Sequence, residues 1–483
     1  MNLLSHFTEQ CQRSPTQLAC TEIDRALSYA QFNHAQQRLA AVLQQHECAT
    51  HCIGVFLDRG IDAAIAIYAI LSAGACYLPL DLKNPPERLH FIVQDAKPRL
   101  ILGQGPCPAW LPTSELWLDI TRLASPATDS INSINSKSIN ANAIAAILYT
   151  SGSTGTPKGV ALSHRAMLNF ADWASITFAL TAHDRIASLA PFHFDLSVFD
   201  LFSSLASGAS VHFMPAHLTL TPSRLSQWLQ TQAISCWYTV PSLLSFLALK
   251  GNLSEHTLPA LRTLLFAGEV FATPALISLA TQLPHVQLYN LYGPTETNVC
   301  CYWPVERSRL KPEHAIPIGL PAAGAELQID PDTGELSINS LNNFAGYWQQ
   351  GALQPLASYP WYASGDKVSR NEWGEYCYHG RLDRMLKCSG YRVEPAEIEQ
   401  VLRQAPAVDD CAVIGIPDPT GGQRPAAVVI LQKNHSLAEL VPWLKVRLPQ
   451  YMQPAKFAIQ NRLPRLSNGK IDYVSLTTLF ENV

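Results

Sequence analysis

The chain has 483 residues, of which 47% are hydrophobic and 15% charged, and its formal net charge at pH 7 is −4. A chain of this length exceeds what one hydrophobic core supports, so we expect at least two domains in a globular, cytoplasmic protein. Binding to nucleic acid or to an anionic membrane surface would need a basic surface, which this balance of charges does not predict.

The N-terminal region predicts neither a targeting signal nor a membrane span. Residues 1–15 lack a basic segment followed by an apolar core, and the 12 cysteines have no disulfide-like spacing, so we expect reduced thiols in the cytoplasm. Residues 63–80 are uncharged and just long enough to cross a bilayer, but Gly74 and Pro79 interrupt them. We expect instead a buried helix over 63–73 and a buried strand over 75–80.

Apolar runs typical of strands alternate with segments of helical periodicity, such as residues 224–232. This alternation predicts an α/β fold with a largely parallel sheet. The polar, repetitive segment 125–143 is expected to form a mobile surface loop. The predicted strands lie at 53–57, 75–80, 99–103, 145–150, 187–191, 210–215, 236–241, 261–268 and 286–293.

The stretch LYTSGSTGTPKGV (148–160) has the composition of a phosphate-binding loop. Glycines let the backbone approach a ligand closely, and backbone N–H groups, hydroxyls and the ammonium of Lys158 together suit an anion. The spacing differs from that of a Walker loop, and taken alone the stretch also fits a flexible surface turn. Later segments supply an aromatic face, carboxylates and a further lysine, so that together they predict a nucleotide site: YGPTE (292–296), YASGD (362–366), GRLDRMLK (380–387) and SNGKID (467–472).

The chain changes character near residues 380–383. The following part predicts a helix over 396–404, strands over 408–417 and 424–432, and a helix over 437–447. We expect this part to form an α+β domain small enough to move as a lid.

In their order along the chain, these motifs resemble the core motifs of the adenylate-forming superfamily, which comprises nonribosomal-peptide adenylation domains, acyl-CoA synthetases and luciferases. The resemblance covers nearly the whole chain and favours the amino-acid-activating branch. It implies a large multi-sheet α/β N-terminal core domain over residues 1–382 and a small, mobile α+β C-terminal lid domain over 383–483, with a hinge at Asp383. Further matching segments lie at 73–95, 194–202, 334–338 and 463–472.

The resemblance implies two half-reactions that use ATP and Mg²⁺. The substrate carboxylate attacks the α-phosphate of ATP and releases pyrophosphate, and a phosphopantetheine thiol then attacks the adenylate and releases AMP. The residues that order the β- and γ-phosphates would be Thr150, Ser151, Ser153, Thr154 and Lys158. The residues around adenine and ribose would be Gly268, Glu269, Asn290, Tyr292, Asp366 and Arg381.

The remaining catalytic roles fall on the turn after residue 292 and on the lid. Thr295 would touch the α-phosphate and Glu296 would bind Mg²⁺, an ion that prefers oxygen ligands. Lys470 would bridge the substrate carboxylate and the nucleotide in the first half-reaction. Rotation at Asp383 would then remove Lys470 and bring in the segment that begins at Lys387.

The resemblance also places a substrate pocket. Asp195 would pair with the α-amino group of the substrate, since acyl and aryl activators usually lack such a carboxylate there. The other lining positions are apolar except for a hydroxyl and a thiol, and they resemble those of free-standing enzymes that load L-proline onto a carrier protein. They are Leu196, Phe199, Tyr238, Leu265, Ala267, Leu291, Val299 and Cys300.

We therefore expect L-proline as the substrate and a separate acyl or peptidyl carrier protein as the acceptor. Valine, leucine or alanine would also suit a short apolar pocket, because such a pocket separates near-isosteres poorly. Two other functions stay open: an acyl-CoA synthetase that uses coenzyme A, and a catalytically silent nucleotide-binding protein.

Overall fold

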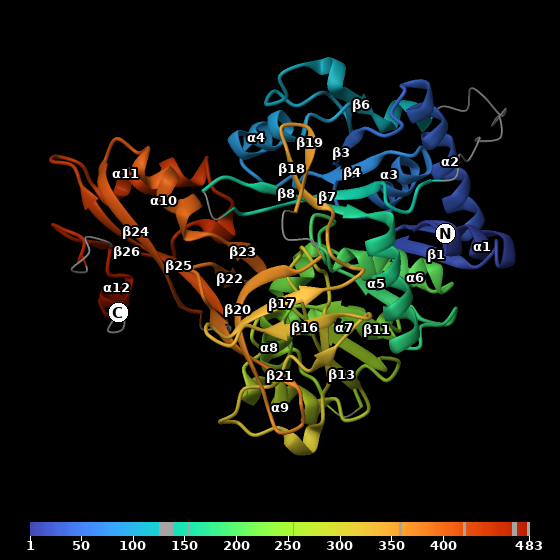
Figure 1. The fold of residues 1–483 in the computed structure, drawn as a ribbon. Helices are drawn as coiled ribbons and strands as arrows, with labels where there is room; N and C mark the ends of the chain where they lie inside the picture. Colours follow the sequence, from blue (N-terminus) through green and yellow to red (C-terminus); the bar gives the residue numbers. More distant parts are fainter. Residues whose placement is uncertain are drawn as a thin grey trace.

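The computed structural model describes residues 1–124, 139–152, 155–254, 256–356, 360–418, 422–465 and 471–480. The N-terminal core contains two large sheets, and the C-terminal elements lie beside it as a smaller unit (Figure 1). The predicted surface loop falls largely on residues 125–138, outside the described residues. All 12 cysteines are free.

The larger sheet has nine strands, and its central strands, from β13 to β1, run parallel, whereas both edges are antiparallel. Three helices, α7 (Pro222–Thr231), α8 (Pro241–Lys250) and α9 (Thr273–Gln282), connect its strands, and each has a proline in its first turn, where the missing N–H costs nothing. In spatial order the strands are β15 (Leu320–Pro321), β14 (Cys301–Pro304), β13 (Gln287–Tyr292), β12 (Thr263–Phe266), β11 (Cys236–Thr239), β9 (Arg185–Ser188), β10 (Ser210–Phe213), β1 (Leu18–Glu22) and β2 (Arg25–Ser28).

The second sheet has eight strands, with a parallel part from β7 to β6. The phosphate-loop segment joins β7 to β8 as an antiparallel hairpin. In spatial order the strands are β19 (Ala352–Pro355), β18 (Gly346–Gln349), β8 (Lys158–Ser163), β7 (Ile144–Thr150), β4 (Cys76–Pro79), β3 (Cys52–Phe56), β5 (Leu100–Gly103) and β6 (Trp117–Asp119). Helices α3 (Ile61–Ser72), α4 (Pro86–Ala96) and α5 (His164–Thr177) contact this sheet, whereas α2 (Tyr29–Gln45) packs on α3 and on β1 and β2 of the larger sheet.

Helix α3 explains the long apolar segment near residue 70. It is buried along nearly its whole length, and the hydroxyl of Tyr68 donates to the carbonyl of Leu201 at 3.1 Å while its ring stacks on Phe202. The segment is thus a core helix followed by strand β4, as predicted. No helix in the described part of the chain is both long and apolar enough to cross a membrane.

A strand overlaps each predicted strand position, although β9 covers Arg185–Ser188 and shares only two residues with the predicted 187–191. The parallel arrangement holds for the centres of the two large sheets. A third, antiparallel sheet had no clear signal in the sequence. Its strands are β16 (Glu326–Ile329), β17 (Glu335–Asn339), β20 (Tyr362–Arg370) and β21 (Tyr376–Arg381). Helices α1 (Ser5–Arg13) and α6 (Ser204–Ala206) pack against each other at the edge of the core.

The lid contains the predicted helices and strands as α10 (Pro395–Arg403), β24 (Val408–Pro417), β25 (Gln423–Leu431) and α11 (Leu437–Lys445). It also contains β26 (Lys456–Ile459), which pairs with β25 in parallel, and the short helix α12 (Tyr473–Thr477). A buried cluster that includes Val393, Ile398, Leu402 and Val429 gives the lid its own core. The hairpin of β22 (Leu386–Cys388) and β23 (Tyr391–Val393) precedes these elements and lies between them and the core domain (Figure 1).

Candidate active site

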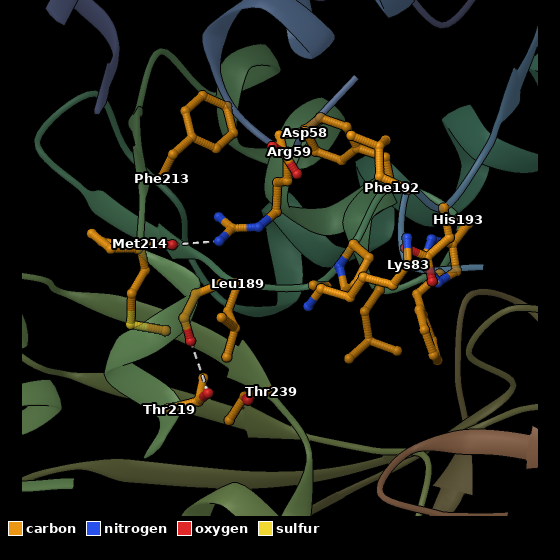
Figure 2. Close-up of a pocket in the computed structure, with 18 of the residues that line it drawn as sticks. Asp58, Arg59, Lys83, Leu189, Phe192, His193, Phe213, Met214, Thr219 and Thr239 are labelled. Atoms are coloured by element: carbon orange, nitrogen blue, oxygen red, sulfur yellow. Dashed lines mark hydrogen bonds and ion pairs between the residues drawn. The ribbon is translucent and has the colours of Figure 1, made fainter. Parts of the chain in front are cut away.

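A cavity of about 1060 Å³ opens at the carboxyl ends of β3, β4, β9, β10 and β11. This is the edge at which open parallel sheets bind ligands. Figure 2 shows the guanidinium of Arg59 turned toward the backbone carbonyl of Met214, with Lys83 and His193 on the other side of the opening. The lid contributes Tyr391 to the lining, so the cavity is bounded by both domains.

The candidate phosphate site contains a contact cluster of Lys158, Glu296, Tyr347 and Arg392. The ammonium of Lys158 lies 3.6 Å from Oε1 of Glu296 and donates to the hydroxyl of Tyr347 at 2.9 Å. That hydroxyl donates to the same Oε1 of Glu296 at 3.1 Å, and Nη1 of Arg392 lies 3.1 Å from it. A single carboxylate is therefore surrounded by two cations and a phenol.

Glu296 is completely buried, and its charge depends on these neighbours. Burial alone would raise the pKa of Glu296, but the charges of Arg392 and Lys158 hold it below its usual value. Burial lowers the pKa of Lys158, an effect that Glu296 opposes. The site thus holds an ionised carboxylate where phosphates and a divalent cation are expected.

The turn that carries Glu296 depends on a glycine. A Cβ on Gly293 would lie 1.5 Å from the carbonyl oxygen of Asn298, so only glycine fits there. Thr295 lies half-buried on this turn, directly before Glu296.

The predicted phosphate loop is described in part. Across the β7–β8 hairpin Thr150 pairs with Lys158, and Oγ1 of Thr150 is buried with no hydrogen-bond partner among the described residues. The hydroxyl of Ser151 donates to the backbone carbonyl of Arg392 at 2.5 Å, a contact between core and lid. Ser153 and Thr154 lie outside the described residues, as does Lys470.

The expected nucleoside site is built from β13, β20 and β21. The hydroxyl of the buried Tyr292 donates to Oδ2 of Asp366, and Nη1 of Arg381 lies 2.8 Å from Oδ1 of the same carboxylate. Arg381 also lies 2.5 Å from Oδ2 of Asp383. The predicted ribose ligand is therefore connected through one arginine to the predicted hinge.

The lid hairpin fills the remaining side of this nucleoside site. The ammonium of Lys387 lies 5.6 Å from the ring centre of Tyr292, and burial lowers the pKa of Lys387 while Asp366 opposes that effect. The carboxylate of Glu269 accepts from the backbone N–H of Gly390 at 2.8 Å. Gly268, with φ of +89°, has only Gly390 near the position that a Cβ would take.

The side chains of Glu269 and Asn290 form hydrogen bonds with backbone groups around the site. Glu269 also accepts from the N–H of Ser242 at 2.9 Å, and burial raises the pKa of Glu269. The amide of Asn290 donates to the carbonyl of Pro317 at 2.8 Å. Both side chains thus help to shape the edge of the site.

The predicted substrate pocket lies where β11, β12 and β13 meet the segment after β9. All the predicted lining positions belong to one buried cluster or, in the case of Leu196, pack against it. The rings of Phe199 and Tyr238 meet edge to face with 5.7 Å between their centres, and Tyr238 pairs with Leu265 across the sheet. Leu196 and Tyr238 also line the large cavity, so the pocket adjoins it.

Asp195 directly precedes Leu196 in the segment after β9, and the positive charge of Lys387 acts on its carboxylate, but less strongly than burial does. No lysine, arginine or histidine among the described residues forms an ion pair with its carboxylate. Removal from bulk water, together with repulsion from Glu296, raises the pKa of Asp195 to about 6. An ammonium group placed beside it would restore the ionised form.

Several contacts at the site had no motif in the sequence. Tyr347 lies in β18, far along the chain from both Lys158 and Glu296, so only the fold brings it to them. Phe199 begins a π-helical turn, η3 (Phe199–Ser203). The pattern of apolar residues in the sequence does not reveal this irregular backbone. The rings of His193 and Phe194 both contact the lid residue Tyr391, another contact that only the domain arrangement creates.

Comparison with known proteins identifies two family models along the chain. Residues 7–348 match the AMP-binding enzyme model, and residues 397–470 match the model of the AMP-binding enzyme C-terminal domain. The chain is 36% identical to an L-proline–[L-prolyl-carrier protein] ligase of Streptomyces coelicolor, over 92% of this chain and 91% of that protein. A protein of the same name from Pseudomonas fluorescens is 34% identical, over 97% of both chains.

A solved structure extends this similarity to the three-dimensional fold. An NRPS protein that contains adenylation and PCP domains matches 100% of this chain and 98% of its own, with a TM-score of 0.82 and 25% sequence identity. The o-succinylbenzoate CoA synthetase of Bacillus subtilis has the same fold, with a TM-score of 0.85 at 23% identity over 98% of both chains.

Proposed function

The chain belongs to the AMP-binding enzyme family, and from this premise we propose that it is a ligase that activates L-proline and transfers it to a carrier protein. In the first step a carboxylate oxygen of proline attacks the α-phosphorus of ATP, which forms prolyl-AMP and releases pyrophosphate. In the second step the phosphopantetheine sulfur of the carrier attacks the acyl carbon. The thioester forms, AMP leaves with the electron pair of the broken C–O bond, and the thiol proton goes to the surrounding water.

The observation that carries this proposal is the carboxylate of Asp195, which has no ion-pair partner among the described residues and directly precedes Leu196, a residue of the cavity lining. A carboxylate kept from water without a cation is costly, and its raised pKa expresses that cost. The ammonium group of an amino acid removes the cost, whereas an aryl or fatty acid does not. The apolar lining behind it then favours a small apolar side chain such as the ring of proline.

The phosphate site supports the use of ATP. Lys158 forms an ion pair with Glu296, the hydroxyl of Thr150 has no hydrogen-bond partner among the described residues, and Glu296 is an ionised oxygen ligand suited to Mg²⁺. When bound, Mg²⁺ would neutralise charge on the phosphate oxygens. Tyr292, Asp366 and Arg381 would bind the nucleoside.

The cavity supports a carrier-bound thiol as the acceptor. Its lining includes Leu196 and Tyr238 of the candidate substrate pocket, Tyr391 of the lid, and Thr219 and Arg25 of the core. A flexible pantetheine arm could enter along this path while the carrier protein stays at the surface. Coenzyme A carries the same arm, and so an acyl-CoA synthetase activity is the second candidate.

The test is amino-acid-dependent exchange of pyrophosphate into ATP, measured with each of the twenty amino acids. A dominant L-proline signal with weak signals from valine, leucine and alanine is expected. A dominant signal from another amino acid would contradict the assignment of L-proline as the substrate. The absence of a signal with all twenty amino acids would contradict the proposed adenylation reaction. Analysis of the thioester formed in competition between coenzyme A and a phosphopantetheine-bearing carrier protein then identifies the acceptor.

A further inference from the structure

Core and lid meet at a second place, away from the reacting groups. We propose that the buried ion pair between Arg88 and Glu397 positions the lid for the transfer step and has no part in adenylate formation. Arg88 lies on α4 of the core and Glu397 in the first turn of α10 of the lid. This inference rests on the two-step function proposed above.

The pair is shielded from water although it joins two domains. Nη1 of Arg88 contacts Oε1 of Glu397 directly, and the two side chains are only 7% and 5% exposed. The same Nη1 lies 3.9 Å from the sulfur of Met452, another lid residue. Any rotation that separates α4 from α10 would break the pair and return both charges to water.

The lid orientation that forms this pair is unsuited to the first step. The guanidinium of the lid residue Arg392 forms an ion pair with Glu296, the proposed ligand of Mg²⁺. The backbone carbonyl of Arg392 accepts a hydrogen bond from the hydroxyl of Ser151 in the predicted phosphate loop. Bound ATP with Mg²⁺ would compete with these contacts. The orientation instead suits the state after pyrophosphate has left, when Lys387 and Gly390 close on the nucleoside site.

Removing one partner of the pair should destabilise only the transfer orientation of the lid. If one partner is removed, the other becomes an unpaired buried charge in the transfer orientation, which is strongly unfavourable. In an orientation with α4 and α10 apart, the remaining side chain is hydrated and costs nothing. A single substitution should therefore shift the lid away from the transfer orientation and leave the adenylation orientation unaffected.

The same interface provides a matched control. Arg447 of the lid lies 3.4 Å from Glu87, the residue directly before Arg88, but these side chains are 22% and 59% exposed. Exposed pairs contribute little to stability, so this pair should be dispensable. The two pairs differ in burial while sharing the same two domains.

The experiment compares Glu397→Gln and Arg88→Met with the control Glu87→Gln. Proline-dependent pyrophosphate exchange reports the first step, and single-turnover formation of prolyl-pantetheine, with pantetheine as the thiol, reports the second. We expect the two test variants to lose about ten-fold or more in transfer, with exchange within about two-fold of the unmodified enzyme. The control should change neither rate by more than about two-fold.

The reversed pair, Arg88→Glu together with Glu397→Arg, should recover part of the lost transfer rate. Equal losses in both assays, unchanged transfer, or an equal effect of Glu87→Gln would overturn the inference. Glu397→Gln keeps the shape of the side chain, so it tests the inference even if Arg88→Met fails to fold. Absence of proline-dependent exchange in the unmodified enzyme would instead overturn the proposed function.

Discussion

The candidate phosphate site and the candidate substrate pocket each contain a carboxylate whose pKa burial tends to raise, but its neighbours affect it in opposite ways. Glu296 lies between Lys158 and Arg392, and these charges keep its pKa low despite burial. Asp195 lies beside an apolar cluster with no ion-pair partner among the described residues, and its pKa rises to about 6. Cations of the protein balance the negative charge of Glu296, whereas the charge of Asp195 would be balanced by the ammonium group of a bound ligand.

This difference shows how the surroundings of one functional group assign its role. A carboxylate that is permanently ionised suits a cation or a charged phosphate network. A carboxylate with a raised pKa is suited to bind a ligand that carries a positive charge. The two sites are close enough that Glu296 contributes to the pKa of Asp195, so changes in one should be felt in the other.

The largest effect is expected from removing the charge of Glu296. Glu296→Gln leaves Lys158 and Arg392 without their carboxylate and removes the proposed ligand of Mg²⁺. We expect pyrophosphate exchange to fall about a thousand-fold, mainly in kcat, because preorganised charge is lost where charge develops. Glu306→Gln, at an exposed glutamate that pairs with Arg309, serves as the control and should change exchange less than about two-fold. Exchange near the normal rate in Glu296→Gln would show that the phosphate site needs no carboxylate.

Asp195→Asn tests the other side of the comparison. The amide cannot balance an ammonium, so we expect the KM for L-proline to rise about a hundred-fold, with a smaller change in kcat. The split between KM and kcat should be opposite to that of Glu296→Gln. Steady-state exchange at varied proline concentrations gives both constants. Retention of the normal KM for proline would remove the main support for an amino acid substrate.

The pKa of Asp195 also predicts a dependence on pH. Binding of the prolyl ammonium requires the ionised carboxylate, and a pKa of about 6 means that protons compete with the substrate below that pH. We expect the KM for proline to be constant above about pH 7 and to rise up to about ten-fold per pH unit below 6. Exchange assays between pH 5 and 8 measure this dependence. In Asp195→Asn the rise should be absent, and a rise that persists there must come from another group.

The sequence motifs indicated candidate residues for both sites but did not indicate the contacts that these residues make. Glu296 and Asp195 lie in segments that follow β13 and β9, and Asp366 lies within β20, in each case within or beside a short motif that carries a clear chemical signal. The pairing of Glu296 with Tyr347 and Arg392 has no local signal, because β18 and the lid reach the site only through the fold. Charge compensation by distant residues is therefore what sequence reasoning could not supply.

The fold shows the same limit. Alternating apolar runs predicted the parallel strands and the helices of the lid, since each depends on local periodicity. The antiparallel sheet of β16, β17, β20 and β21 and the parallel pairing of β26 with β25 depend on long-range register. The hinge at Asp383 stays a prediction, although Arg381 connects it to Asp366.

The smallest effect tests the apolar part of the substrate pocket. Val299→Ala removes two methyl groups from a buried lining position, which should admit the larger ring of pipecolate. Apolar pockets discriminate weakly per methylene, so we expect the ratio of kcat/KM for pipecolate over proline to rise about three- to ten-fold. Val305→Ala is the matched control, because Val305 is similarly buried but belongs to a different hydrophobic cluster. Both variants should lose a similar free energy of unfolding, about 1 kcal/mol or somewhat more. A change in the ratio of kcat/KM values that occurs only in Val299→Ala therefore reports a change in the pocket and not a general loss of stability. An unchanged ratio in Val299→Ala would place the side chain of the substrate elsewhere, and the apolar cluster beside Asp195 would then serve only as core.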